Sequence, residues 1–303
     1  MRVAFLGNDR WSVPTLDAVH ASAHDVVLVV TAPPRPAGRG RHETPTAVAR
    51  RARELGLPLN ETGGNLVPVL ADAELDALVV VAYGRLLSQA ALDVAAVAPI
   101  NLHFSLLPEL RGASPVETAL LRGDRRTGVS VIRMTADLDA GPVYASREVA
   151  IAPDDDAGRL GGRLAVLGAS LVVETLDALA EGRAVAMAQD EERVTWCGRL
   201  GAEDRRLRWA DEDAARTVDR CRASMPPGAW TTFRGKQLKV LAASVEEGSG
   251  APGSILAVDR GGIVVAASDG AVRLREVVPQ GRGRMSASDF AHGVRPDVGE
   301  RLG

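Results

Sequence analysis

Short, β-branched apolar runs alternate with longer helical stretches in the first half of the chain. This alternation is typical of βαβ units and predicts a doubly wound, mostly parallel sheet with helices on both faces. We expect strands at 2–6, 26–30, 77–82, 100–104, 128–134 and 143–151. We expect helices at 12–22, 44–56, 86–95, 114–122 and 157–182.

Two of these helices carry clear start signals in the sequence. Thr44-Pro45 offers an N-cap followed by proline at the first helical position, where the missing N–H is tolerated. Ser114-Pro115-Val116-Glu117 has the spacing of a capping box. Both signals predict that the helices begin at these residues.

The pattern changes at about residue 185, beyond which the apolar runs are short and are joined by tight-turn sequences such as Arg260-Gly261-Gly262 and Asp269-Gly270. After one helix at 211–223, strands are predicted at 230–233, 237–242, 254–258, 263–267 and 272–278. Five short strands suit a small Greek-key barrel of the OB type. We therefore predict an α/β domain at 1–188, a polar linker at 189–202 and a β-barrel domain at 203–303.

Composition is that of an ordinary globular protein, with 46% hydrophobic and 25% charged residues among 303. The formal net charge of −3 would by itself disfavour a nucleic-acid partner. Residues 33–53 differ from this average, because they carry six arginines and one acid, Glu43. Such a stretch is either a solvated loop with a charged helix face or a local site for phosphates.

Several function classes are disfavoured by what the sequence lacks. Cys197 and Cys221 have no Cys or His at metal-binding spacing, so no metal site or disulfide framework is predicted. The apolar runs are shorter than the roughly 18 residues of a membrane span, so we expect no membrane association and a cytoplasmic location. Gly7-Asn8-Asp9-Arg10 follows the first strand without the glycine fingerprint of a dinucleotide site, which disfavours a dehydrogenase.

Candidate chemistry is concentrated at the end of the predicted strand 100–104. Alternation places Asn101, His103 and Ser105 on one face, at a strand end where open α/β sheets bind ligands. Asp139 lies in a turn between two later strands and can orient His103 if the fold delivers it to the same edge. Alone, an Asn-x-His pair is more often an ordinary buried histidine. The chain has no nucleophile elbow. The trio of Asn101, His103 and Asp139 therefore suits proton transfer and oxyanion stabilisation, with the substrate supplying the nucleophile.

The segments Asn101-Leu102-His103, Ser105-Leu106-Leu107-Pro108, Arg111-Gly112 and Leu138-Asp139-Ala140-Gly141 together resemble the signature of the folate-dependent formyltransferases. Similar segments of that family match Arg35–Arg41, Val80–Gly84, Pro227–Trp230 and Ala291–Arg295. The resemblance is nearly end to end. It is strongest to the branch that formylates methionine on initiator tRNA.

The resemblance implies a Rossmann-like formyltransferase domain and an OB-like barrel. It implies that Asn101, His103 and Asp139 are catalytic and act on 10-formyltetrahydrofolate, without a metal. The implied folate-binding residues are Val81, Ala82, Tyr83, Gly84, Ser105, Leu106, Leu107 and Pro108. The implied partner is initiator methionyl-tRNA, contacted by Arg35, Arg39, Arg41, Lys236 and Lys239 of a monomer.

Two segments depart from the family pattern, at Asn8–Trp11 and Glu61–Asp76, and both leave the amino acceptor open. A nucleotide-linked amino sugar is one alternative acceptor, and water, giving hydrolysis of the formylfolate, is another. From a different class, the chain could be a tRNA-binding module without catalysis.

Overall fold

The computed structural model describes residues 1–37 and 42–303, which form two compact units. The first unit comprises Met1–Pro115, Arg126–Ala150 and Gly161–Cys197, and the second comprises Val116–Arg125, Ile151–Leu160 and Gly198–Gly303. The segment 189–202 thus divides after Cys197, and its designation as a linker stays a prediction.

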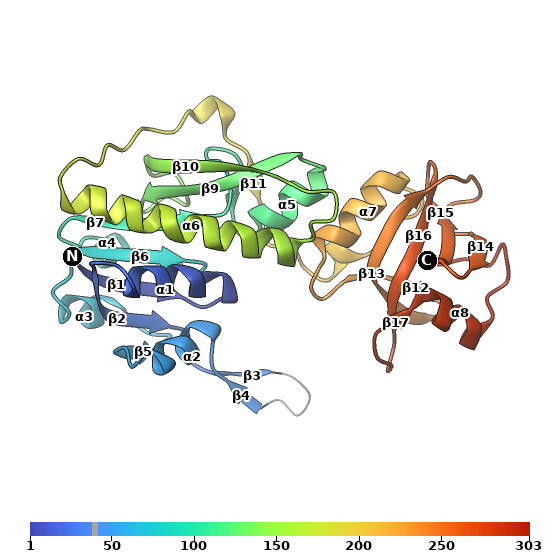
Figure 1. Ribbon diagram of the computed structural model, residues 1–303, viewed down its shortest axis with the longest axis horizontal. Coiled ribbons are helices and arrows are strands. Elements are labelled where there is room, and N and C mark those ends of the chain that lie inside the picture. Colours follow the sequence, from blue (N-terminus) through green and yellow to red (C-terminus); the bar gives the residue numbers. More distant parts are fainter. Residues whose placement is uncertain (38–41) are drawn as a thin grey trace. The chain divides into compact units, whose positions relative to one another are not determined.

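A seven-stranded sheet forms the centre of the first unit, with strand order β10-β9-β7-β6-β1-β2-β5 (Figure 1). The five strands from β7 to β5 are parallel to one another. At one edge, β9 pairs antiparallel with β7, and β10 pairs antiparallel with β9. The predicted doubly wound, mostly parallel sheet is therefore confirmed. The strands are β1 (Arg2–Gly7), β2 (Asp25–Thr31), β5 (Leu59–Glu61), β6 (Ala77–Val81), β7 (Ala98–His103), β9 (Arg126–Arg133) and β10 (Val143–Ala150).

Helices cover both faces of this sheet, as Figure 1 shows. Alternate residues of the strands, among them Leu6 and Val80, form a core with α3 and α4. The opposite face packs on α1, α2 and α6, where Leu102 of β7 meets α6 at Gly168. The helical elements are η1 (Arg10–Ser12), α1 (Val13–His20), α2 (Ala47–Glu54), α3 (Val67–Ala71), α4 (Gln89–Leu92) and α6 (Ala157–Ala180).

The register of β7 decides where its polar residues lie. Asn101 is paired with Val80 of β6, so the two share a face, and Leu102 is paired with Val81. Because Leu102 points to α6, Asn101 and His103 project from the opposite face, the one on which α3 and α4 pack. The chain therefore presents both polar side chains at the carboxyl end of β7.

The predicted helix 44–56 begins three residues late, and its predicted N-cap is wrong. Thr46 is the N-cap, and its side chain accepts a hydrogen bond from the Ala49 N–H at 2.9 Å. Thr44 instead ends strand β4 (His42–Thr44), which pairs with β3 (Arg35–Ala37). The residue before a proline is biased to extended backbone, which explains why Thr44 remains in the strand. The predicted helix 86–95 is reduced to α4.

The second unit is built on a six-stranded antiparallel sheet of order β12-β13-β16-β15-β14, with β17 on β16. The five predicted strands are all present, and the chain end completes the sheet. Leu302 bridges to Phe233 of β12, and Arg301 bridges to Ser254 before β14. The C-terminal residues therefore link the two edge strands of this sheet.

The core of this unit encloses Trp209, Phe233 and Phe290, with the two phenylalanine rings 5.9 Å apart and edge to face. Helix α8, which supplies Phe290, was not predicted. The elements are α5 (Pro115–Arg122), η3 (Glu203–Arg205), α7 (Ala214–Ala223), β12 (Ala229–Phe233), β13 (Lys236–Glu246), β14 (Ile255–Asp259), β15 (Gly262–Ala266), β16 (Ala271–Pro279), β17 (Met285–Ser286) and α8 (Ala287–Val294).

Candidate active site

The imidazole of His103 lies between a backbone carbonyl and a carboxylate. Its side chain is 6% exposed, its Nε2 is 2.9 Å from the Leu110 carbonyl oxygen, and its Nδ1 is 3.6 Å from Oδ2 of Asp139. A carbonyl oxygen only accepts hydrogen bonds, so Nε2 carries a proton.

Asp139 reaches His103 from the loop between β9 and β10. Its backbone has a φ of 50°, in the left-handed region that aspartate tolerates better than most residues. Its Oδ2 accepts a hydrogen bond of 2.9 Å from the backbone N–H of Gly112. Gly112 lies in β8 (Arg111–Gly112), beside β11 (Trp196–Cys197), and a Cβ there would be 2.1 Å from the Cys197 carbonyl oxygen. Only glycine fits this position.

Asn101 completes the trio from β7, two residues before His103 and on the same face. Its side chain is half-buried and makes no hydrogen bond to another residue in the described part of the chain. The amide is therefore able to bond a ligand at the strand end. The structure thus brings Asn101, His103 and Asp139 together.

The loop 105–108 follows the end of β7, so Ser105 is not a third polar residue of that strand, as alternation had suggested. The Ser105 hydroxyl instead donates to the Glu109 carbonyl oxygen at 2.5 Å. Ser130 fastens the loop, because its hydroxyl donates to the Ser105 carbonyl and accepts from the Leu107 N–H, at 2.9 and 3.1 Å. Leu106 and Leu107 are half-buried and Pro108 is buried.

The loop 81–84 follows β6 and is held by Asn8, the residue after β1, and by Ser12 of η1. The Ser12 hydroxyl donates to the Val81 carbonyl oxygen at 2.7 Å, and the Asn8 amide donates to the Tyr83 carbonyl oxygen. The Tyr83 side chain is 2% exposed and packs in the core on the α3 and α4 face of the sheet. Ala82 and Gly84 are exposed, with φ angles of 43° and 75°. Of the predicted folate loop 81–84, Ala82 and Gly84 are therefore the exposed residues.

Asn8 joins three strand ends at this edge, a role that sequence reasoning missed. Besides its bond to Tyr83, its Oδ1 accepts from the Thr31 hydroxyl at 2.8 Å and from the Ala32 N–H at 2.7 Å. The sequence indicated only that this segment departs from the family pattern.

Arg111 is a buried cation close to the trio, only 3% exposed. Its guanidinium makes two hydrogen bonds to Glu191, at 2.7 and 3.2 Å, and lies 5.9 Å from the centre of the Trp196 ring. The hydrogen bond from Arg111 lowers the pKa of Glu191. Arg111 is adjacent to both Leu110 and Gly112, so this ion pair anchors the segment that contacts His103 and Asp139.

The arginine-rich stretch forms a small two-stranded arm, β3 and β4, before α2. Arg35 is exposed on β3, whereas Arg39 and Arg41 lie outside the described residues. On α2, Arg51 pairs with Asp17 at 2.7 Å and Arg53 pairs with Glu61. The positive charge of the helix is thus partly neutralised, while the arm keeps Arg35 exposed.

Lys236 and Lys239 both lie on β13, but the structure does not place them on one face. Leu238 and Val240 are buried, so Lys239 points to the outer face. Lys236 has the parity of the buried residues and is exposed because it begins the strand. Nearby arginines are paired with carboxylates, Arg234 with Glu300 and Arg273 with both Glu246 and Asp259.

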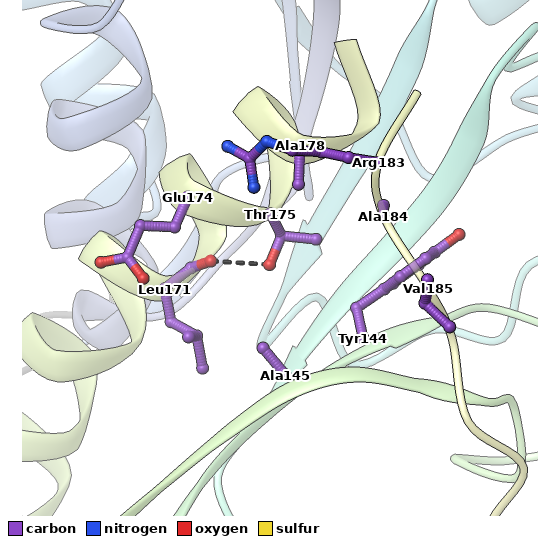
Figure 2. A pocket seen from close by; sticks show the side chains of 9 residues that line it. All are labelled: Tyr144, Ala145, Leu171, Glu174, Thr175, Ala178, Arg183, Ala184 and Val185. Carbon is purple, nitrogen blue, oxygen red and sulfur yellow. Dashed lines mark hydrogen bonds between the residues drawn. The ribbon is translucent and has the colours of Figure 1, made fainter. Parts of the chain in front are cut away.

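A separate hollow of about 270 Å³ lies in the first unit between β10 and the end of α6 (Figure 2). Tyr144, Glu174 and Arg183 are among its lining residues, and Thr175 donates a 2.7 Å hydrogen bond to the Leu171 carbonyl inside it. None of the predicted site residues lines this hollow.

Residues 1–37 and 42–303 hold no cluster of three His, Cys, Asp or Glu side chains that could bind a metal ion. Among the helices of these same residues, none has both the length and the apolar character needed to cross a bilayer.

The family models for formyl transferases match the chain in two consecutive stretches. The model described as formyl transferase matches residues 1–176, and the model of the formyl transferase C-terminal domain matches residues 199–295. The chain belongs to the formyl transferase family.

Curated relatives that match the chain over their full length include methionyl-tRNA formyltransferases. It is 40% identical to the methionyl-tRNA formyltransferase of Jannaschia sp. (strain CCS1), over 97% of each chain. It is 42% identical to the methionyl-tRNA formyltransferase of Nocardioides sp. (strain ATCC BAA-499 / JS614), over 100% of this chain and 98% of the relative.

A similar fold occurs in HypX from Aquifex aeolicus in complex with tetrahydrofolic acid. The TM-score is 0.68 at 19% identity, over 99% of this chain. The match spans about half, 48%, of that longer chain.

Proposed function

We propose that the protein transfers the formyl group of 10-formyltetrahydrofolate to the amino group of methionine on initiator methionyl-tRNA. The observation that carries the proposal is the contact between His103 and Asp139 beside Asn101, at the carboxyl end of β7 in a formyl transferase chain. Curated relatives that match the whole chain and are named methionyl-tRNA formyltransferase support methionyl-tRNA as the acceptor.

The reaction needs a donor for an oxyanion and a route for one proton. The amine nitrogen attacks the formyl carbon, a C–N bond forms, and the carbonyl oxygen takes up negative charge. The Asn101 amide donates a hydrogen bond to this oxygen, and a protonated His103 ring supplies positive charge beside it. The bond between the formyl carbon and N10 then breaks, and the proton lost by the amine is gained by N10.

Asp139 contributes to these reaction steps through His103. Its carboxylate stabilises the protonated imidazole and holds the ring between Oδ2 and the Leu110 carbonyl. It also assists the proton on its way from the amine to N10. The substrate amine is the nucleophile, so the protein needs no nucleophilic side chain.

The two substrates would be held by different parts of the chain. The loops 81–84 and 105–108 are the proposed walls of the folate pocket, with contacts made mainly by backbone groups and by Leu106 and Leu107. Arg35, Arg39 and Arg41 are the proposed contacts to the tRNA acceptor stem, with Lys236 and Lys239 as further proposed contacts to the RNA. Charged tRNA is a cytoplasmic substrate, so we propose that the reaction takes place in the cytoplasm. We also propose that the protein acts as a monomer.

An acceptor panel tests the proposal. The protein is incubated with 10-formyltetrahydrofolate and either charged initiator tRNA, an amino-sugar nucleotide or no acceptor, and both tetrahydrofolate and formylated product are measured. We expect both tetrahydrofolate and a formylated product with charged initiator tRNA, and neither with the amino-sugar nucleotide or without an acceptor. Tetrahydrofolate release without acceptor would indicate hydrolysis, transfer to the sugar would change the acceptor, and no release with any acceptor would indicate a binding module.

A further inference from the structure

The Gln189 amide makes hydrogen bonds to both segments that surround the His103 ring. Its Nε2 donates to the carbonyl oxygens of Asp139 and Gly141, each at 2.7 Å. Its Oε1 accepts from Nε and Nη2 of Arg111, at 3.0 and 2.8 Å. A glutamine amide has two donor hydrogens and two acceptor lone pairs, so all four positions are in use.

These partners also fix the direction of the amide. Carbonyl oxygens only accept and a guanidinium only donates, so a flipped Gln189 would face donors with donors and acceptors with acceptors. Glu191 holds the far side of the same guanidinium. Gln189 therefore has one orientation, set by Arg111 on one side and by the Asp139 turn on the other.

The Asp139 turn is tightly confined where Gln189 binds it. A Cβ at Gly141 would be 1.7 Å from the Arg133 carbonyl oxygen, so the turn lies directly against the end of β9. The Asp139 side chain is held by Gly112, and its own carbonyl is held by Gln189. The residue is thus fixed at both its backbone and its carboxylate.

The same amide acts on the other side of the ring through Arg111. In the sequence, Arg111 is flanked by Leu110, whose carbonyl oxygen accepts a hydrogen bond from His103, and by Gly112, whose N–H donates one to Asp139. Gln189 therefore joins the segment 110–112 to the turn 139–141 by hydrogen bonds, and these are the two segments that contact His103. Both segments are distant from residue 189 in the sequence.

We propose that Gln189 is a positioning residue, which sets the geometry of the His103 and Asp139 pair by tying these two segments together. The proposal rests on the proposed function, because positioning is measured through formyl transfer. Misplacement of a catalytic group by about 1 Å can cost roughly a hundredfold in rate. A change at Gln189 should therefore act on the chemical step rather than on substrate binding.

The substitution Gln189→Glu tests this role with little change of shape. Both acceptor contacts to Arg111 are kept, but the two donors are replaced by a carboxylate oxygen that faces two carbonyls. We expect kcat to fall at least about tenfold, while KM for each substrate changes less than about twofold. Gln89→Glu adds the same charge at an exposed position on α4 and loses one hydrogen bond to Asp93, and it should leave kcat and KM unchanged.

A second variant, Gln189→Met, removes all four hydrogen bonds without adding charge. It should show the same loss of kcat, and it decides the question if Gln189→Glu does not fold. Thermal unfolding of each variant is measured beside the kinetics. An unchanged kcat, or a lower yield of folded protein with kcat and KM unchanged per folded enzyme, would reduce Gln189 to a structural residue and overturn the proposal. Absence of formyl transfer by the unsubstituted protein would instead overturn the proposed function.

Discussion

Asp139 and Gly112 lie 27 residues apart in the sequence, and the Gly112 N–H of β8 donates a 2.9 Å hydrogen bond to Oδ2 of Asp139. The same oxygen lies 3.6 Å from Nδ1 of His103. The carboxylate that faces the imidazole is therefore held by a backbone group that cannot move without displacing β8, which makes this contact the fixed point of the site.

Asp139→Asn keeps the size of the side chain and removes its charge. We expect kcat to fall by about 10² to 10⁴, the range of a general acid–base contribution, and His103→Ala to lose a similar amount. Steady-state kinetics and circular dichroism measure the two effects. Retention of more than about a hundredth of the activity in a folded variant would remove these residues from the mechanism.

Asn101→Ala deletes the proposed donor to the oxyanion. Loss of one such donor costs about 10² to 10³ in kcat, with little change in KM, because the bond forms mainly in the transition state. Single-turnover rates give the comparison directly. A variant that loses substrate affinity and keeps its single-turnover rate would show that Asn101 binds substrate instead.

The sheet and the Asn101 and His103 pair were predictable from the sequence for a physical reason. Buried parallel strands leave apolar runs such as Ala77–Val81, and residues two apart on one strand share a face. β5 and α3, with three and five residues, are too short to show a period. The two-stranded arm β3 and β4 was missed because its strands are short, polar and interrupted by proline.

Contacts between segments that are distant in the sequence could not be predicted from local sequence patterns. Motif resemblance pointed to Asp139, but its approach to His103 depends on the return of the loop after β9. Gln189 lies in a polar segment without periodicity, and its partners belong to β8 and to the loop after β9, so no spacing in the sequence indicates it. Asn8 is similar, since its bonds run to Thr31, Ala32 and Tyr83.

The arginine arm predicts a salt effect on RNA binding. Removal of one phosphate-binding side chain should reduce the slope of log affinity against log salt by about 0.7 to 0.9. We expect a shallower slope for Arg35→Ala, and a larger change when Arg39 and Arg41 are also replaced. Filter binding of charged tRNA over a salt series measures it. Arg53→Ala is the control, because Arg53 pairs with Glu61, and an equal slope for all variants would exclude the arm from RNA binding.

Two adjacent glycines of α6 offer a matched test of packing. A Cβ at Gly161 would lie 2.1 Å from the Trp11 ring, which itself packs 5.7 Å from Phe104, whereas a Cβ at Gly162 meets nothing within 4 Å. Gly161→Ala should destabilise the protein by about 1–3 kcal/mol through overpacking. Gly162→Ala should stabilise it by about 1 kcal/mol through helix propensity. Denaturant unfolding gives both values, and equal effects at the two sites would contradict the packing of Trp11.

His24 gives the protein a pH-dependent stability. Burial, with the Met1 amino group beside it, lowers the pKa of His24 from 6.5 despite Asp177 at 3.1 Å. The unfolded chain therefore binds the proton first, and the free energy of unfolding falls as the pH drops below 6.5.

Replacement of His24 by Gln should flatten this dependence between about pH 7.5 and 5, whereas His20→Gln, at an exposed position of α1, should leave it unchanged. Urea unfolding across that range measures both variants. A slope in His24→Gln as steep as in the unsubstituted protein would assign the effect to other groups.

The most direct test of the proposed reaction is the stoichiometry of a single turnover. Enzyme in excess is mixed with 10-formyltetrahydrofolate and methionyl initiator tRNA, and tetrahydrofolate and formylmethionyl-tRNA are counted in the same quenched samples. We predict that the two appear together, one for one, and that neither appears with Asp139→Asn on the same time scale. Tetrahydrofolate without formylated tRNA, or equal yields from the variant, would contradict this mechanism.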